Sequence, residues 1–406
     1  MAKQTIGIGS AANDGTGSTL RAAFDICNDN FTELYDGSGG LLHKIEGTNF
    51  TGSLLVGHST TGTLSSAENN TGVGIGALDA LTSGDSNVAI GNLAGSAITT
   101  GGSNILIGRA AGDALLEGSS NVAIGHFALS AEDAHGRNTA IGTKALQVQN
   151  AGADAYNVAI GFETGKLITT GVANTIIGSF AGDALTTGGN NVVVGYQALS
   201  AEDEHGNNVA VGYQALQVLN AGNSGNNVAV GREAGKVVST GIKNTILGSK
   251  AGDLLETGEN NIIIGYNSEA SAVDVNNEIT LGDANITAFR CADQSIAALS
   301  DGRDKSDVVE SPYGLEFINK LKPVKFTWDF RPEHMSDVKQ GKSRVGFIAQ
   351  DLQEAMPNND NDILDLVYEI SEDRLEAKYG NLIPVMAKAI QELSAEVKEL
   401  KKQING

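Results

Sequence analysis

Two segments of the chain carry side chains that can act as nucleophile, base or metal ligand. The first is Ser-Asp-Gly-Arg-Asp-Lys, in which Ser300 and Lys305 lie five residues apart. A serine hydroxyl is a weak nucleophile that needs a neighbouring base. A lysine amine acts as that base only when burial or a nearby cation lowers its pKa from about 10.4. Asp301 and Gly302 favour a tight turn after the serine, although the hexapeptide alone is typical of an ordinary polar linker.

The second segment is Glu-Asp-Ala-His, which ends at His135 and returns as Glu-Asp-Glu-His ending at His205. Carboxylates beside a histidine are a possible divalent-metal site. The alternative is a polar corner between two repeats of the fold. We favour the polar corner, so His135 and His205 are only weak candidate ligands. We expect no resident metal and no cofactor.

The residues around Ser300 belong to a longer series of motifs. YGLEFINKLKPVKFTW begins at Tyr313, VGFIAQDLQEAMP begins at Val345, and a terminal helix begins at Asn381. Together with the hexapeptide, these motifs resemble the intramolecular chaperone auto-processing domain of phage tailspikes and tail fibres. The resemblance covers nearly all of residues 300–406, in the family's order.

This resemblance implies a self-cleaving serine–lysine dyad. Ser300 Oγ would attack the carbonyl of Leu299 and Lys305 would take the proton, so that the Leu299–Ser300 bond is cut. Asp301 and Arg303 are possible supporting residues, with Arg303 lowering the lysine pKa or stabilising the oxyanion. The expected enzymatic activity is at most one self-cleavage per chain, with no multiple turnover.

The elements before this domain are set by an internal repeat. Asn-Val-Ala-Ile-Gly or a close variant recurs, mostly in steps of 17 residues, with a 70-residue superperiod. Its closing glycine falls at Gly76, Gly91, Gly108, Gly125, Gly142, Gly161, Gly178, Gly195, Gly212, Gly231, Gly248, Gly265 and Gly282. One such unit cannot bury its own apolar face, so a fixed period of this kind predicts a solenoid.

Each repeat reads as a short strand followed by a turn or helical fragment. Alternation directs Val158 and Ile160 to one face and Ala159 to the other, while Ala181 and Leu185 add apolar positions to the second half. The glycine predicts a positive φ or a close backbone approach. A recurring asparagine predicts a ladder of stacked amides or the same turn closed in every rung; it occurs at Asn121, Asn138, Asn157, Asn174, Asn191, Asn208, Asn227, Asn244 and Asn261.

Both ends carry apolar residues at heptad spacing, which is typical of coiled coils. The C-terminal set is Ile383, Met386, Ile390, Leu393, Val397, Leu400 and Ile404. The shorter N-terminal set is Leu20, Phe24, Cys27, Phe31 and Leu34, for which one amphipathic helix packed on its own strand is an equal alternative. The first forty residues resemble a module at the front of marine phage structural proteins, and the repeat resembles phage fibre shafts and, more loosely, the head rolls of trimeric bacterial adhesins.

Composition separates the two parts and excludes several functions. All five prolines and the only tryptophan lie after residue 300, whereas 46 of the 52 glycines lie before it. The net charge of −21 repels phosphate backbones, so we expect no nucleic-acid binding. The absence of an 18-residue apolar run argues against membrane insertion.

These observations predict a mainly β chain with five segments. They are an attachment module (1–45), a linker and shaft start (46–69), a trimeric β-solenoid shaft (70–282), a cap (283–299) and an α+β chaperone domain ending in a coiled-coil helix (300–406). We expect a homotrimeric phage tail fibre, assembled in the host cytoplasm, that binds other virion proteins and a host receptor of glycan type. The alternatives are a trimeric bacterial adhesin and a polysaccharide-depolymerising tailspike, the latter disfavoured by few aromatic residues in the repeat.

Overall fold

The computed structural model describes residues 43–45, 49–57, 61–290, 300–329, 340–357, 360–371 and 374–405. The chain divides into two compact units, Met1–Asp283 and Ala284–Gly406. The N-terminal heptad set and all of the expected attachment module (1–45) except residues 43–45 lie outside the described residues. The fold is mainly β and contains the predicted solenoid.

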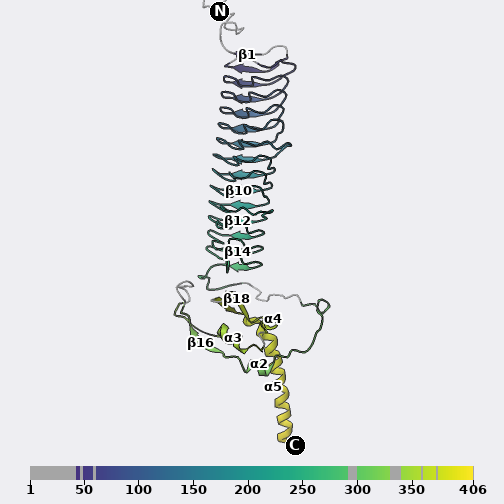
Figure 1. Cartoon of the computed structure of the whole chain (residues 1–406), viewed down its shortest axis with the longest axis vertical. Helices are drawn as coiled ribbons and strands as arrows, with labels where there is room; N and C mark the ends of the chain where they lie inside the picture. The colour runs from purple at the N-terminus through teal and green to yellow at the C-terminus, as the bar shows by residue number, and fades with distance from the viewer. Residues whose placement is uncertain are drawn as a thin grey trace, which may run out of the picture. The chain divides into compact units, whose positions relative to one another are not determined.

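The first unit is one 15-stranded sheet in which the strands follow chain order (Figure 1). Only β1 pairs antiparallel, with β2; each later strand pairs parallel with the one before it. The strands are three residues long, and they are β1 (His43–Ile45), β2 (Leu54–Val56), β3 (Thr71–Val73), β4 (Val88–Ile90), β5 (Ile105–Ile107), β6 (Val122–Ile124), β7 (Thr139–Ile141), β8 (Val158–Ile160), β9 (Thr175–Ile177), β10 (Val192–Val194), β11 (Val209–Val211), β12 (Val228–Val230), β13 (Thr245–Leu247), β14 (Ile262–Ile264) and β15 (Ile279–Leu281).

Each rung buries the middle residue of its strand. In β8, Ala159 is fully buried while Val158 and Ile160 are partly exposed, which confirms the predicted alternation. The second half of the rung consists of turns rather than helix, and it contributes Ala181 and Leu185 to the same core. A three-residue strand buries little by itself, so the core becomes continuous only through stacking.

The predicted asparagine ladder is confirmed. Asn174 Oδ1 accepts a hydrogen bond from the Asn191 backbone at 3.0 Å, and Asn174 Nδ2 donates to the Gly188 carbonyl at 2.9 Å. The pattern extends beyond the predicted set, from Ser53, which accepts from the Asn70 backbone, to Asn261, which accepts from the Glu278 backbone. One buried amide therefore links neighbouring rungs, and in most rungs it also closes the turn.

The closing glycine meets both of its predicted requirements. Gly178 has φ of +134°, and a Cβ there would lie 2.4 Å from the carbonyl oxygen of Gly195 in the next rung. The alignment through Gly76 was wrong: the register pairs Val73 with Ile90, so Gly74 is the residue equivalent to Gly91, 17 residues later. Gly76 lies two residues further along, in the following turn. The parallel stack also includes β2, within the segment expected to start the shaft.

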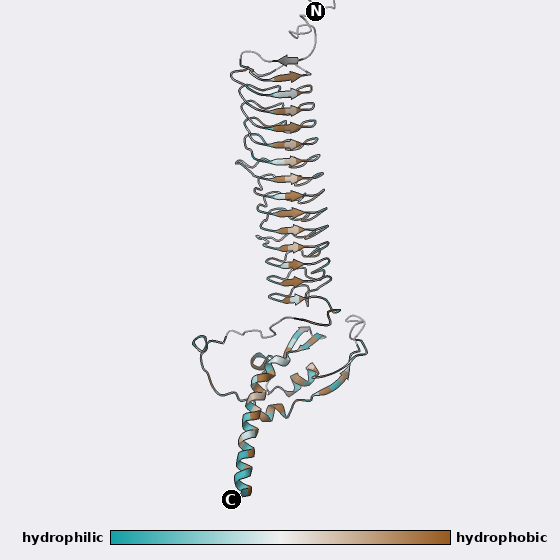
Figure 2. Cartoon of the chain, turned by 180° about the vertical axis from the view of Figure 1, so that it is seen from behind, coloured by the Kyte–Doolittle hydropathy of each residue, from teal (hydrophilic) through white to brown (hydrophobic). Residues whose placement is uncertain are grey.

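The other face of this sheet is apolar and has no cover within the described residues. The first and third residues of β2–β15, here called the outer sheet face, are mostly Val, Ile, Leu or Thr. Ile177 in β9 is 38 % exposed and Val192 in β10 is 40 % exposed. The middle residues of these two strands, Ile176 and Val193, are buried. Figure 2 shows the resulting hydrophobic colouring along the strands. Parallel sheets are usually covered on both faces, so this face is unusual for a single chain.

The second unit is a small α+β domain. Its elements are η1 (Gly302–Asp304), α2 (Leu315–Ile318), β16 (Val324–Thr327), β17 (Ser343–Gly346), α3 (Ala349–Ala355), α4 (Asn361–Leu364), β18 (Val367–Ser371), β19 (Arg374–Ala377), η4 (Tyr379–Asn381) and α5 (Leu382–Asn405). β16 pairs antiparallel with β17, and β18 with β19. Phe317, Leu352 and Leu366 form its core together with Leu382 and Val385 of α5.

Candidate cleavage site and chaperone unit

The structure brings the two predicted dyad residues together. Lys305 Nζ donates a hydrogen bond to Ser300 Oγ over 2.6 Å. The turn between them is the 3-10 helix η1, closed by bonds from the Asp304 and Lys305 backbones to the carbonyls of Asp301 and Gly302. A sequence separation of five therefore becomes a direct contact because the intervening residues make one tight turn.

Asp301 and Arg303 form the turn rather than contact the dyad. Asp301 caps η1 by accepting from the Arg303 backbone at 2.9 Å. The Arg303 side chain also donates from Nε to both carboxylate oxygens of Asp301, at 3.0 and 3.1 Å. These hydrogen bonds lower the pKa of Asp301 and raise the pKa of Arg303. Both groups are solvent-exposed, so the pair contributes more to geometry than to stability.

The dyad is solvent-exposed in the single chain. Both Ser300 and Lys305 are exposed, and no residue from 301 to 310 is buried. Leu299, whose carbonyl the serine would attack, lies outside the described residues. A neutral lysine amine is favoured by removal from water, so these two residues meet only the distance requirement for general-base catalysis.

The segment after the dyad is tied to the long helix α5. Glu310 pairs with Lys388, and Glu392 accepts from the Leu315 backbone at 2.7 Å, which caps the start of α2. A Cβ at Gly314 would lie 2.3 Å from the Glu392 carboxylate, so a larger residue there would push this side chain away from the Leu315 backbone. Helix α5 therefore holds both the chain that follows the dyad and the core of the unit.

Helix α5 confirms the predicted helix, and its apolar heptad residues face solvent. The seven residues Ile383, Met386, Ile390, Leu393, Val397, Leu400 and Ile404, here called the α5 seam, are all exposed, by 41–80 %. The neighbouring face of the first turns of α5 buries Leu382, Val385 and Ala389 against the unit. An apolar hollow of about 390 Å³, lined by Leu321, Phe347 and Met386 among others, lies beside the start of the seam.

A family model described as chaperone of endosialidase matches residues 300–361, starting at Ser300 itself. Over these residues the C-terminal unit is similar to that chaperone family. The match ends in α4, so α5 and its seam lie beyond it. No curated protein and no solved structure matches the chain. Among the described residues, no helix has both the length and the apolar character that a membrane crossing requires.

The shaft carries a row of aromatic side chains that sequence reasoning did not single out. Phe162, Phe180, Tyr196 and Tyr213 come from four successive rungs, with ring centroids 5.3, 6.1 and 5.7 Å apart. The rings of Tyr196 and Tyr213 are stacked, and the Arg232 guanidinium lies 5.9 Å from the Tyr213 ring. Phe180 lies two residues after the closing glycine of its repeat, whereas the other three aromatic residues lie one residue after theirs. The row therefore does not occupy one fixed position of the repeat and is not apparent from the sequence.

Proposed function

We propose that this chain is a subunit of a homotrimeric virion fibre whose C-terminal unit assembles the shaft and then cuts itself off. The observation that carries the proposal is the α5 seam, an apolar stripe exposed along the one long helix of the chaperone unit. An exposed apolar stripe of this length is costly in water and is covered when helices of several chains pack together.

The outer sheet face supports the same assembly in the shaft. Its apolar side chains run through rung after rung, so copies of the solenoid that pack through this face would bury a continuous surface. The asparagine ladder and the solenoid core are complete within one chain. Each chain therefore winds its own roll, and association uses the face that the roll leaves uncovered.

The number of copies rests on the likeness to fibre chaperones. At heptad spacing, the a positions hold Ile383, Ile390, Val397 and Ile404, and the d positions hold Met386, Leu393 and Leu400. Beta-branched residues at a with leucine at d favour two strands in isolated coils. That preference applies to isolated helices, whereas the full chain also has the outer sheet face as a second association surface. On the likeness to fibre chaperones, we propose that the assembled fibre contains three chains.

A register problem explains the need for such a chaperone. Neighbouring rungs of the shaft are nearly equivalent, so a slip of one rung changes the local contacts little. Association through the α5 seam aligns the chains before their shafts pack. Removal of the chaperone afterwards leaves the shaft without its route back to separate chains, which makes it kinetically stable.

The proposed cut is an internal acyl transfer followed by hydrolysis. Ser300 Oγ attacks the Leu299 carbonyl carbon, Lys305 accepts the hydroxyl proton, and the peptide C–N bond breaks as the proton passes to the Ser300 amine. Water then hydrolyses the ester, which leaves a carboxylate at Leu299 and a new amino terminus at Ser300. Because Ser300 and Lys305 are exposed in one chain, we propose that a neighbouring chain covers them and that association precedes cleavage.

The aromatic row gives the proposed fibre a surface for a host glycan. Aromatic rings stack on the apolar faces of sugar rings, and amides bond to their hydroxyl groups. Tyr196 and Tyr213, both 44 % exposed, lie next in sequence to Gln197 and Gln214, whose amides bond to each other at 2.9 Å. We propose that this row contacts an extended surface polysaccharide. A Tyr196→Ala/Tyr213→Ala chain that binds host glycans as well as wild type would contradict this assignment.

The oligomeric state tests the proposal. We expect light scattering on the wild-type full chain to give three copies, and the Leu393→Asp/Leu400→Asp variant to give mainly single chains or misassembled material. Lys398→Asp/Lys401→Asp, which puts the same residue at two exposed positions of α5 outside the seam, serves as the matched control and should remain trimeric. A monomeric wild type, or a seam variant that assembles normally, would contradict the proposal.

A further inference from the structure

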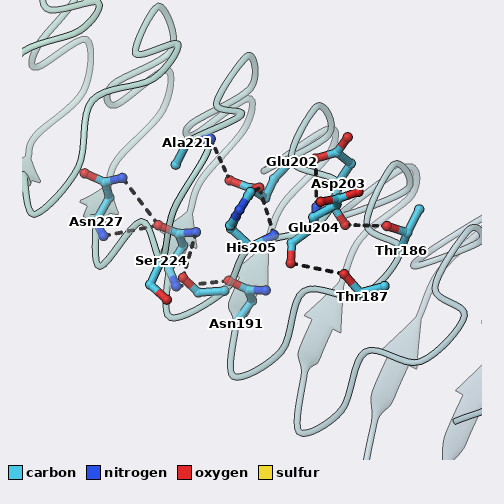
Figure 3. Close-up of polar contacts among 12 residues, drawn as sticks. Thr186, Thr187, Asn191, Glu202, Asp203, Glu204, His205, Ala221, Ser224 and Asn227 are labelled. Atoms are coloured by element: carbon cyan, nitrogen blue, oxygen red, sulfur yellow. Dashed lines mark hydrogen bonds and ion pairs between the residues drawn. The ribbon is translucent and has the colours of Figure 1, made fainter.

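Two clusters of ionisable residues recur at equivalent places on the solenoid. Glu132, Asp133 and His135 follow β6, and their counterparts Glu202, Asp203 and His205 follow β10, 70 residues later. Within each cluster, one donor atom from each of the three residues lies within 4.8 Å of the others. Figure 3 shows the second cluster, where Glu202 and His205 approach each other between rungs.

The glutamate of each cluster is completely buried. Glu132 and Glu202 are 0 % exposed, and each accepts from the backbone of the histidine three residues later, at 3.1 and 3.2 Å. Glu202 also accepts from the Ala221 backbone at 3.2 Å. The equivalent Ala151 backbone lies near Glu132, whose Oε2 is buried without a hydrogen bond of good geometry. A buried carboxylate in a shaft turn is costly unless something compensates its charge.

The histidine of each cluster also has an unsatisfied atom. Nδ1 of His135 and Nδ1 of His205 are buried and make no hydrogen bond. They lie 3.6 and 3.4 Å from Oε1 of Glu132 and Glu202. This separation is long for a hydrogen bond between nitrogen and oxygen. Two ligands held at about 2.1 Å in a tetrahedral metal site lie about 3.4 Å apart, so the spacing fits two donors to one ion.

We propose that each cluster binds one zinc ion, through the glutamate carboxylate, the aspartate carboxylate and the Nδ1 atom of the histidine. Water would complete a four-coordinate site. An imidazole nitrogen among the donors favours zinc over calcium or magnesium, which prefer oxygen ligands. All three donors of a site come from one chain, so zinc binding does not depend on the proposed assembly of the fibre.

The position of the clusters suggests what the ion does. After each cluster, the repeat takes its longer step of 19 residues, from Gly142 to Gly161 and from Gly212 to Gly231. The bond from the Ala221 backbone to Glu202 links the cluster to the longer turn of the next rung. A bound ion would fix the glutamate that holds this turn, and it would stabilise the folded shaft by mass action.

Zinc titration of the untagged full chain, dialysed first against a chelator, tests this proposal. We expect calorimetry to give two ions per wild-type chain, one for His135→Ala or His205→Ala, and none for the double variant. Cobalt, used as a spectroscopic probe, should give the visible absorption of a tetrahedral site only where zinc binds. His126→Ala, which changes a histidine outside both clusters, should keep two ions.

The same titration separates the proposal from a simple ion pair between glutamate and histidine. Asp133→Asn/Asp203→Asn leaves that ion pair intact and should still weaken zinc binding by more than about tenfold, since changing a residue that only supports a ligand already costs about that much. Equal zinc stoichiometry in wild type and the double histidine variant, or no binding by wild type, would overturn the proposal. Circular dichroism on each variant verifies that the shaft is folded.

Discussion

Lys305 Nζ lies 2.6 Å from Ser300 Oγ, so a potential nucleophile and a potential base are in direct contact at the first residue of the chaperone match. The contact exists because η1 folds the intervening residues into one turn, which the Asp301 side chain caps. The pair has the distance required for proton transfer. What the single chain lacks is exclusion of water, since both residues are exposed.

The first prediction concerns the lysine. Lys305→Met removes the proposed base and should slow self-cleavage by at least about 100-fold, the lower end of what a general base contributes. The chaperone core does not involve this side chain, so the variant should still form trimers. A time course on denaturing gels measures the rate. Lys320→Met, at an exposed lysine outside the site, is the control, and cleavage of Lys305→Met at the wild-type rate would exclude the lysine as base.

A second prediction concerns the outer sheet face. Ile177→Lys/Val192→Lys places two charges on adjacent strands of the surface that we propose to lie between chains. Burying them there is costly, so the released shafts should separate or fail to assemble, as measured by light scattering. Thr187→Lys, in an exposed turn of the same part of the shaft, should have no effect. Normal assembly of the double variant would assign the interface elsewhere.

The asparagine ladder gives a third prediction. Asn174→Ala leaves the Asn191 backbone and the Gly188 carbonyl without their partners inside the core. Each unsatisfied buried group costs about 1–3 kcal/mol, so the variant should lose about 2–6 kcal/mol of stability and unfold at lower denaturant concentration. Asn150→Ala, at an exposed position, should unfold like wild type, and an unchanged Asn174→Ala midpoint would mean that the ladder is not stabilising.

A fourth prediction concerns pH and the partly buried Asp183 carboxylate. Burial raises the pKa of Asp183, and its Oδ1 has no partner. A carboxyl group whose folded pKa lies above its unfolded value of about 3.9 destabilises the fold at high pH, and this penalty disappears as pH falls through the folded pKa. Asp183→Asn should therefore raise the thermal midpoint at pH 7 by about 2–4 °C and lose this advantage near pH 4.

Asp253→Asn provides the comparison for that experiment. Asp253 occupies the same place in its rung as Asp183 but is exposed. Its substitution should change the midpoint little at any pH. If Asp183→Asn gives the same advantage at pH 4 as at pH 7, burial of the charge is not the cause.

The sequence predicts the features that recur in every rung, because aligning the repeats of the chain with one another shows the same residue many times. Asn174 and Gly178 are examples: their buried amide and positive φ follow from recurrence at a fixed place. It also predicts α5, because heptad spacing is a local property of one helix.

Features that occur in a single rung, or that depend on the direction of a side chain, are harder to predict from the sequence. Only the strand register shows that Gly74 is equivalent to Gly91, because Gly76, two residues later, is also a glycine and fits the repeat about as well in the sequence. The alternation of Val158 and Ala159 does not say which side is the core. The bond between Arg303 and Asp301 depends on the conformation of η1, which composition does not determine.

Intact mass measurement on wild type and Ser300→Ala, under native and then denaturing conditions, tests the central claim most directly. We predict that wild type gives a trimeric shaft ending at Leu299 and a fragment beginning at Ser300, and that Ser300→Ala gives a trimer of uncut chains. Wild-type chains that assemble but stay whole would contradict self-release. Uncut single chains in both samples would contradict the chaperone-driven fibre as well.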